Sequence, residues 1–372
     1  MTTIVVGAGI VGASAAYHLA RKGEDVILVD KRFKGEATAA GAGIVCPWIS
    51  KTDDPDWYRL ARNGALYYPE LMERLKQDGE EHVGFAFVGA LGVNEEESEL
   101  AAMEARAHQR KQDTPEVGEI KRLSYGEAKA LFPPLKEGLE AVYVEGAARL
   151  DGRLLRDALC RAAKKHGAQV VEGEACLVYE EEAICGVEVE GTVYEGDTVI
   201  AASGAWAKQL AESIGITIEV EPQKGQIAHI GMEGYDTSKW PVVLPQTSHY
   251  LVCFDDARVV IGATRETGSG FDYRLTAGGV YEVLDEGLRV APGLSEGSLR
   301  EVRIGFRPAS KDLKPLLGRV KALKGLVIAT GLGASGLTMG PYVGTLAAAL
   351  AVGEEPDIDL APYDPLRKSD SF

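Results

Sequence analysis

The chain has 372 residues, of which 45% are hydrophobic and 26% are charged, as in folded globular proteins. This length favours two domains, or one domain with a large insertion, over a single small core. The net charge of −16 repels phosphate backbones and anionic lipid surfaces, so it argues against a nucleic-acid partner.

The first residues and the cysteines give no sign of export. Residues 1–12 lead directly into an apolar strand without the basic leader of a signal peptide, so we expect the mature protein to begin here. The five cysteines are odd in number and form no C-x-x-C pair, which favours neither a disulfide framework nor a zinc site. We therefore expect a cytoplasmic protein without a metal.

Residues 3–30 predict a strand, a glycine turn, a helix and a second strand, the unit that binds dinucleotides. Gly7 permits the tight turn, Gly9 lets a pyrophosphate approach the backbone, and Gly12 lets the helix pack against the strand. Asp30 ends the second strand, where a carboxylate accepts hydrogen bonds from a ribose diol, which disfavours NADP. This motif alone does not separate FAD from NAD.

Residues 35–50 are rich in small residues and glycine where the next helix of a nicotinamide domain would begin. Such a segment can pass beneath a flat ring, with Thr38 meeting the pyrophosphate and Ala42, Gly43 and Ile44 running past an isoalloxazine. The alternative is a tight surface loop.

Two further stretches extend this unit. Residues 150–181 predict a turn, an amphipathic helix ending near Gly167 and a strand toward Cys176. A later strand ends in the small residues 201–204, as expected of a strand entering a nucleotide-binding sheet. We expect Trp206 to pack in the core.

Residues 325–353 carry no charge, which raises the alternative of a membrane span. Glycines and Pro341 interrupt the stretch, however, and favour a buried wall against a cofactor. This segment predicts a strand, a glycine turn and a helix with Pro341 near the start of the helix. Too little chain follows for a second nucleotide domain, so we expect this segment to complete the first one and to face the part of a reduced flavin that becomes anionic.

Seven segments occur in an order that resembles the D-amino-acid oxidase superfamily, nearest to bacterial glycine oxidases and D-amino-acid dehydrogenases. They are the glycine motif with Asp30, the A-A-G-A-G loop, the L-D-G turn and helix, A-S-G-A-W, P-Q-K-G-Q at 222–226, G-F-R-P-A-S-K-D-L-K-P-L-L-G at 305–318 and T-G-L-G-A-S-G-L-T-M-G-P at 330–341. The segment at 305–318 is far more specific than either glycine motif.

The resemblance implies an α/β (α+β) fold, with a glutathione-reductase-type FAD-binding Rossmann domain and an antiparallel-sheet substrate domain. We expect the discontinuous FAD-binding domain to comprise residues 1–85, 145–215 and 318–372, and the substrate domain residues 86–144 and 216–317. The flavin is expected to be noncovalent, although Cys46 lies close in sequence to the flavin loop.

The motifs and the resemblance together predict a set of residues that contact FAD. They are Gly7, Gly9, Ile10, Val11, Gly12, Asp30, Lys31, Ala37, Thr38, Ala42, Gly43, Ile44, Cys176, Gly204, Gly331, Gly333, Ala334, Ser335, Gly336, Leu337 and Thr338.

At the substrate end, Arg307 matches the family arginine that binds the substrate carboxylate, and arginine suits this role because its planar fork makes two charge-assisted bonds. Tyr250 matches the tyrosine that supplements it, while strand alternation turns His249 to the opposite face. Ala334 stands where some relatives have a second arginine, which favours small neutral substrates.

The resemblance implies an enzyme that oxidises a small amino acid or amine, of the glycine, sarcosine or D-amino-acid type, to an imine by hydride transfer to flavin N5. We assign no acid or base, since positioning and desolvation supply the acceleration. The alternatives are a dehydrogenase for 2-hydroxy acids or proline, and the flavin subunit of a larger complex. Dioxygen or a redox partner is the electron acceptor, and an oligomer is compatible with the sequence.

Overall fold

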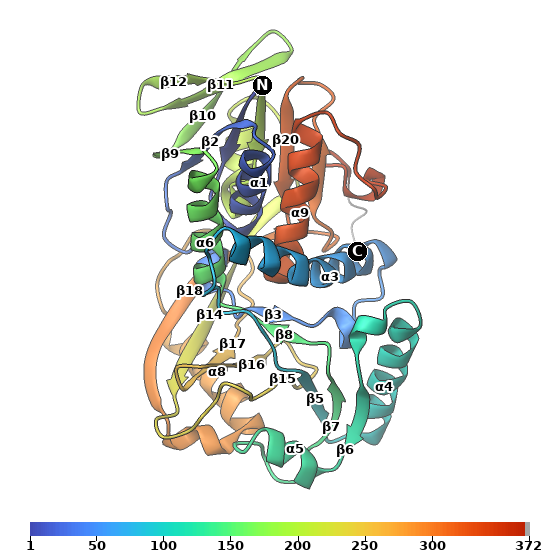
Figure 1. Cartoon of the computed structure of the whole chain (residues 1–372). Coiled ribbons are helices and arrows are strands. Elements are labelled where there is room, and N and C mark those ends of the chain that lie inside the picture. Colours follow the sequence, from blue (N-terminus) through green and yellow to red (C-terminus); the bar gives the residue numbers. More distant parts are fainter. Residues whose placement is uncertain (369–372) are drawn as a thin grey trace.

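The computed structural model describes residues 1–368 and contains two large sheets, one above the other in Figure 1. The upper sheet has six strands in the order β19-β20-β13-β1-β2-β9. Its strands pair in parallel, except that β19 runs antiparallel to β20. Their bounds are β1 Thr2–Val6, β2 Asp25–Asp30, β9 Gln169–Glu172, β13 Thr198–Ala201, β19 Leu316–Arg319 and β20 Leu326–Thr330.

The lower sheet has eight strands in the order β18-β14-β17-β16-β15-β5-β7-β6. It is antiparallel except where β15 pairs in parallel with β5. The bounds are β5 Ala90–Asn94, β6 Ile120–Leu123, β7 Glu140–Val144, β14 Val220–Gly231, β15 Val242–Leu244, β16 Tyr250–Phe254, β17 Arg258–Gly262 and β18 Ser298–Ser310. The long strands β14 and β18 rise toward the upper sheet (Figure 1).

Two three-stranded sheets complete the strands. One is β10 Ala175–Glu180, β11 Ala183–Val189 and β12 Thr192–Glu195, and the other is β3 Ile44–Val45, β8 Ala148–Arg149 and β4 Ala86–Phe87. The helices are α1 Ile10–Arg21, α2 Ala37–Ala40, α3 Pro55–Gln77, α4 Glu97–Gln112, α5 Tyr125–Leu131, α6 Gly152–Lys165, α7 Ala207–Glu212, α8 Ala277–Val290 and α9 Gly336–Ala351. The two large sheets draw their strands from the ranges expected for the two domains, although β19 begins at Leu316, two residues before the expected boundary.

The two ends of the described chain meet where α1 packs against α9, side by side in Figure 1. Glycines permit this close approach. A Cβ atom on Gly340 would lie 2.6 Å from Ile10 Cγ2, and one on Gly344 would lie 2.6 Å from Ser14 Cβ. Ser14 also donates a hydrogen bond of 2.7 Å to the carbonyl of Pro341. The N-terminal and C-terminal glycine turns are therefore held at the carboxyl ends of the parallel strands β1 and β20.

The expectation that Pro341 lies near the start of the last helix is wrong, because α9 begins at Gly336 and Pro341 lies inside it. A proline has no N–H group for the carbonyl four residues earlier, which here belongs to Leu337. The hydroxyl of Tyr68 on α3 donates to that carbonyl instead. The substitute donor explains why the proline is tolerated within the helix.

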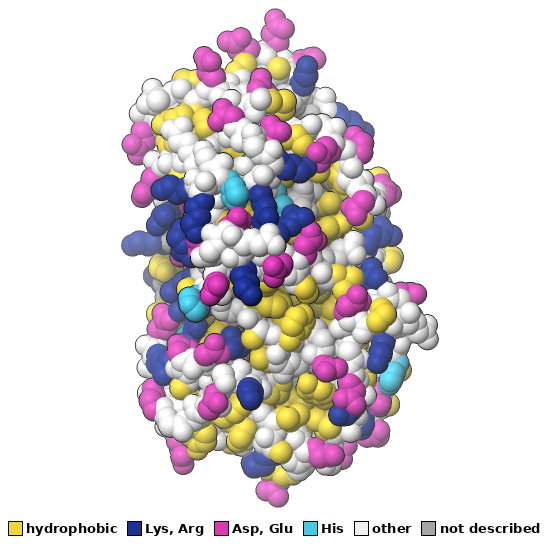
Figure 2. Space-filling view, in the orientation of Figure 1, with side chains coloured by type: hydrophobic (Ala, Val, Ile, Leu, Met, Phe, Trp, Pro, Cys, Tyr) yellow, Lys and Arg dark blue, Asp and Glu magenta, His cyan; other side chains and the backbone are white. Residues whose placement is uncertain are grey.

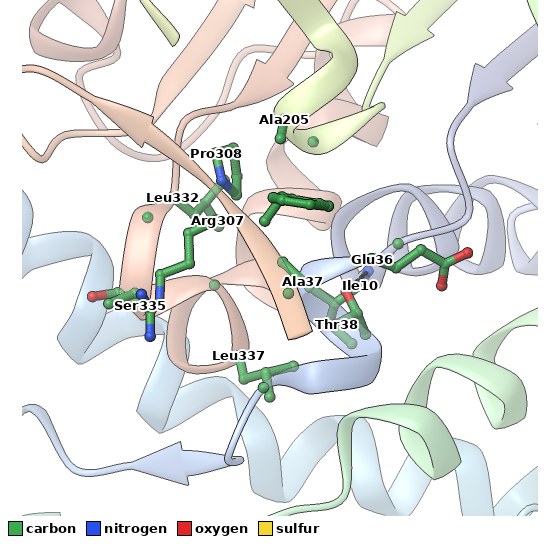
Figure 3. Close-up of a pocket in the computed structure, with 18 of the residues that line it drawn as sticks. Ile10, Glu36, Ala37, Thr38, Ala205, Arg307, Pro308, Leu332, Ser335 and Leu337 are labelled. Carbon is green, nitrogen blue, oxygen red and sulfur yellow. Dashed lines mark hydrogen bonds between the residues drawn. The ribbon is translucent and has the colours of Figure 1, made fainter. Parts of the chain in front are cut away.

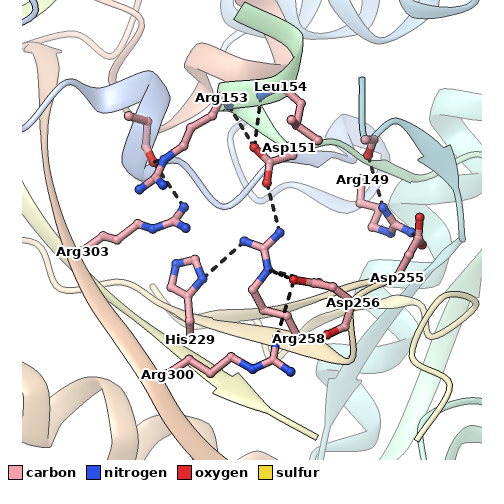
Figure 4. Close-up of polar contacts among 12 residues, drawn as sticks. Arg149, Asp151, Arg153, Leu154, His229, Asp255, Asp256, Arg258, Arg300 and Arg303 are labelled. Atoms are coloured by element: carbon pink, nitrogen blue, oxygen red, sulfur yellow. Dashed lines mark hydrogen bonds and ion pairs between the residues drawn. The ribbon is translucent and has the colours of Figure 1, made fainter. Parts of the chain in front are cut away.

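A polar cluster joins the eight-stranded sheet to the six-stranded half of the molecule (Figure 4). Asp151 caps α6 by accepting from the amides of Arg153 and Leu154, and its second oxygen accepts from Arg258 at 3.0 Å. Burial raises the pKa of Asp151, but the Arg258 guanidinium and the two amides outweigh it and hold the pKa below its ordinary value. The ion pair therefore stabilises the fold in its charged form.

Replacing Asp151 with asparagine is expected to lower the free energy of unfolding by about 1–3 kcal/mol at pH 7, since asparagine keeps the cap but loses the ion pair. The pKa of Asp151 is lower in the folded protein than in the unfolded chain. The stabilisation by the Asp151–Arg258 ion pair is therefore fully present above about pH 4 and disappears as the pH falls through the folded pKa. Urea unfolding at several pH values measures it. Asp256→Asn is the control, because Asp256 pairs with the same arginine from an exposed position and should change stability by less than about 0.5 kcal/mol.

Acidic and basic side chains mix over the face seen in Figure 2. Within residues 1–368, no helix is both long and apolar enough to cross a membrane. In the same part of the chain, no group of three or more metal-ligating side chains is arranged to hold an ion.

Candidate active site

A cavity of about 660 Å³ lies between the six-stranded sheet and the upper ends of β14 and β18 (Figure 3). Its lining contains Arg307, Tyr250 and every residue predicted to contact the cofactor except Gly12 and Gly331. The segments that contribute are far apart in the sequence and include both glycine turns. This is the arrangement expected if one ligand is held by the two ends of the chain.

Gly12 and Gly331 shape the walls without lining the cavity. A Cβ on Gly12 would lie 1.8 Å from the carbonyl oxygen of Gly7, so only glycine lets α1 pack against the turn. Gly331 has a φ of +78°, and a Cβ there would lie 2.8 Å from Leu316 Cδ1. Both residues therefore shape the turns, and their contact with the ligand stays a prediction.

The first turn of α1 is open toward the cavity. Gly7 adopts a φ of +101°, and Thr38 Oγ1 accepts from the amide of Ile10 at 3.0 Å. A Cβ on Gly9 would meet only Thr38 Oγ1, at 3.5 Å, so the space in front of this turn is free of protein atoms. Amide donors at a helix N-terminus beside such a space fit the pyrophosphate of a dinucleotide.

The end of β2 presents an acid to the cavity. Burial raises the pKa of Asp30, against the opposing effects of the Ala8 amide and Arg156. The neighbouring Lys31 forms an ion pair with Glu174, and Cys176 lines the cavity from exposed strand β10. A carboxylate at this position fits the ribose of an adenine nucleotide.

The other half of the cavity lies between residues 42–44 and the turn before α9. Thr338 Oγ1 donates to the carbonyl of Ile44 at 2.9 Å, which ties the two segments together. Gly204, Gly333 and Gly336 have no atom within 4 Å of where a Cβ would lie. These glycines form an open cradle with the N-terminus of α9 beside it, which fits a flat ring that becomes anionic.

Arg307 on β18 lies in the wall of the cavity that the eight-stranded sheet forms (Figure 3). Its Nη1 donates to the carbonyl of Thr264 at 2.9 Å, and its guanidinium faces the hydroxyl of Tyr250. Two glycines leave room for these side chains: a Cβ on Gly225 would lie 2.7 Å from Arg307 Nη2, and one on Gly262 would lie 2.6 Å from Tyr250 Oη. The backbone around both residues thus permits the arginine–tyrosine pair predicted from the sequence.

Arg307 lacks an acidic partner. Burial lowers the pKa of its guanidinium, and the nearby charge of Arg265 adds to the effect, while Tyr250 and the more distant carboxylate of Glu266 oppose it. Within residues 1–368, no carboxylate lies at ion-pair distance from Arg307. A half-buried cation that no carboxylate of the protein pairs with is costly, so the site is suited to an anionic ligand.

Several lining residues were not predicted from the sequence. Arg265 follows β17 and lines the cavity from an exposed position. His249 also contributes to the lining, although its imidazole lies 3.5 Å from Glu282 on α8. Trp206 stacks between Phe33 and Phe271, with ring centroids 4.8 and 4.9 Å away, so it packs as expected and lines the cavity as well. The sequence signal for Arg265 is weak, since it is a single charge after a strand.

Comparison with known proteins gives a consistent result. The DAO family pattern, described as FAD dependent oxidoreductase, matches residues 2–350. Iminodiacetate oxidase from Chelativorans sp. BNC1 has a similar structure with a TM-score of 0.95 and 49% identity, covering 98% of each chain. Glycine oxidase from Pseudomonas aeruginosa is 31% identical over 97% of this chain and 98% of its own. Glycine oxidase from Geobacillus kaustophilus superposes with a TM-score of 0.87 at 26% identity, covering 99% of both chains. These matches confirm the resemblance, the fold class and the cofactor, and the chain belongs to the DAO family of FAD-dependent oxidoreductases.

Proposed function

We propose that this enzyme oxidises a carbon–nitrogen bond of a small amine that carries a carboxylate on the adjacent carbon, as in glycine, sarcosine or an N-substituted glycine. The observation that carries the proposal is the Arg307 guanidinium, which enters the cavity without a carboxylate partner in residues 1–368. The similarity to glycine oxidases and to an iminodiacetate oxidase supports an amine substrate over a 2-hydroxy acid.

In this proposal, Arg307 binds the substrate carboxylate with its planar fork, and the Tyr250 hydroxyl adds a hydrogen bond to it. Bound FAD supplies a hydride acceptor. The carbonyl of Thr264 fixes one end of the guanidinium and so sets the orientation of the substrate. The lining residues that lie between positions 225 and 308 include no aspartate or glutamate. We therefore assign no carboxylate base: the substrate enters with its amine neutral, gives up a hydride and leaves as an iminium ion, which water hydrolyses.

Anaerobic reduction of the purified yellow protein tests the proposal. The panel contains glycine, sarcosine, iminodiacetate, D-alanine, D-proline, L-proline and lactate, each followed at the flavin absorbance maximum. We expect rapid bleaching by at least one N-substituted glycine or glycine and none by lactate. Bleaching by lactate alone, or by no member of the panel, would contradict it. Admission of oxygen with a peroxide assay then separates an oxidase from a dehydrogenase.

The cofactor is proposed to be noncovalent, and Cys46 is the residue that bears on this point. Cys46 lines the cavity, but burial raises the pKa of its thiol to about 12, which keeps it protonated at neutral pH. The thiolate is the reactive form of cysteine. Precipitation of the protein with acid should therefore release all of the flavin into the supernatant, and yellow colour retained in the washed pellet would show a covalent bond.

A further inference from the structure

A second arginine, Arg265, lines the cavity near Arg307. Arg265 lies one residue after Thr264, whose carbonyl oxygen accepts the hydrogen bond from Arg307. Its charge contributes to lowering the pKa of Arg307 and acts on Tyr250 as well, so the three side chains share one region of the cavity.

Arg265 has no counter-ion of its own. The adjacent acid, Glu266, is already engaged by the buried Lys224 at 3.3 Å and by Gln226 and Thr264. Among the residues that the structure describes, no carboxylate lies within ion-pair distance of Arg265. Lys51, another cation of the lining, differs because it is paired with Glu99 at 2.8 Å.

Two arginines without ion-pair partners repel one another, and a ligand with a single carboxylate would neutralise only one of them. This local positive charge occurs in a chain whose net charge is −16, so it is not a consequence of overall composition. A ligand with two carboxylates would neutralise both guanidinium groups. The absence of an arginine at position 334, which favoured neutral substrates on sequence grounds, is thus offset by Arg265 from another element.

We propose that Arg265 binds a second carboxylate of the substrate, so that the enzyme selects amines with one carboxylate on each side of the nitrogen. This rests on the proposed oxidation of a carbon–nitrogen bond, with Arg307 holding the carboxylate next to the oxidised carbon. Arg265 is exposed, so it binds the distal carboxylate at the mouth of the cavity.

The test compares ligands that differ by one carboxylate. Iminodiacetate and sarcosine are the oxidisable pair. Thiodiacetate and (methylthio)acetate are the matched pair with sulfur in place of the nitrogen, so they bind without amine oxidation. Dissociation constants come from flavin absorbance titration and from the concentration dependence of anaerobic reduction. Arg265→Met is expected to weaken binding of both dicarboxylates at least about tenfold, and of the monocarboxylates by less than about twofold. Arg265→Lys should fall between the two.

Arg274→Met is the matched control, because Arg274 is an exposed arginine in the following loop that pairs with Asp272 and does not line the cavity. It should leave all four dissociation constants unchanged. An equal loss for monocarboxylates and dicarboxylates in Arg265→Met, or no loss for either, would overturn the assignment. If the wild-type flavin is reduced neither by these two amines nor by glycine, the proposed function is wrong, while the two sulfur ligands still report on Arg265.

Discussion

Replacing Arg307 with leucine is expected to weaken binding of the substrate carboxylate by roughly a hundredfold or more. The substitution removes two charge-assisted hydrogen bonds, together about 3 kcal/mol or more. The flavin content should remain unchanged, because the predicted cofactor contacts come from other segments of the cavity. The dissociation constant, obtained from the concentration dependence of anaerobic flavin reduction, measures the effect directly.

Two further variants separate this role from a general effect on the fold. Arg307→Lys keeps the charge but loses the fork, so its affinity should lie between those of the wild type and the leucine variant. Arg300 lies on the same strand, β18, and pairs with Glu233 outside the cavity, so Arg300→Leu should bind substrate normally. An unchanged dissociation constant in Arg307→Leu would show that the carboxylate binds elsewhere.

Gly9→Val is expected to give a folded protein that lacks flavin, whereas Gly12→Val is expected to destabilise the fold. At Gly9 the backbone has a φ of −66°, which any residue adopts, and the added side chain meets only Thr38 before entering the cavity. It therefore occupies space required by the pyrophosphate and removes amide contacts, which should weaken FAD binding by about a hundredfold or more.

At Gly12 the added Cβ would lie 1.8 Å from the Gly7 carbonyl oxygen, so α1 must shift. We expect a loss of stability of about 3 kcal/mol or more, with or without flavin. The ratio of flavin to protein absorbance and the thermal unfolding of both apoproteins distinguish the two cases. Normal flavin content in Gly9→Val, or an apoprotein of Gly12→Val as stable as the wild type, would contradict this division of roles.

The sequence was informative where a backbone requirement leaves a local pattern. Glycines at 7, 9 and 12 followed by Asp30 occur within one strand–turn–helix–strand unit, and the structure has that unit within a residue or two. The helix after Asp151 and the strand before Ala202 were predicted for the same reason. Such elements depend on short-range propensity and periodicity, which a single sequence records.

Other features depend on tertiary contacts and were not accessible. The position of Pro341 inside α9 is one such feature, since a Tyr68 hydroxyl from a different helix donates to the carbonyl that Pro341 leaves without a partner. Arg265 reaches the cavity only because β17 pairs with β14 and β16, and nothing local marks it. The parallel pairing of β5 with β15 joins residues about 150 positions apart, beyond the range of any local signal.

The contact between α1 and α9 has a consequence for biosynthesis. The ribosome makes the glycine turn after β1 long before the turn that precedes α9, because most of the 372 residues lie between them. A chain that stops before β20 therefore lacks part of the cavity lining, and its first sheet lacks the strand that pairs with β13. We therefore expect a chain that lacks the turn before α9 to leave the cavity incomplete and to retain little flavin.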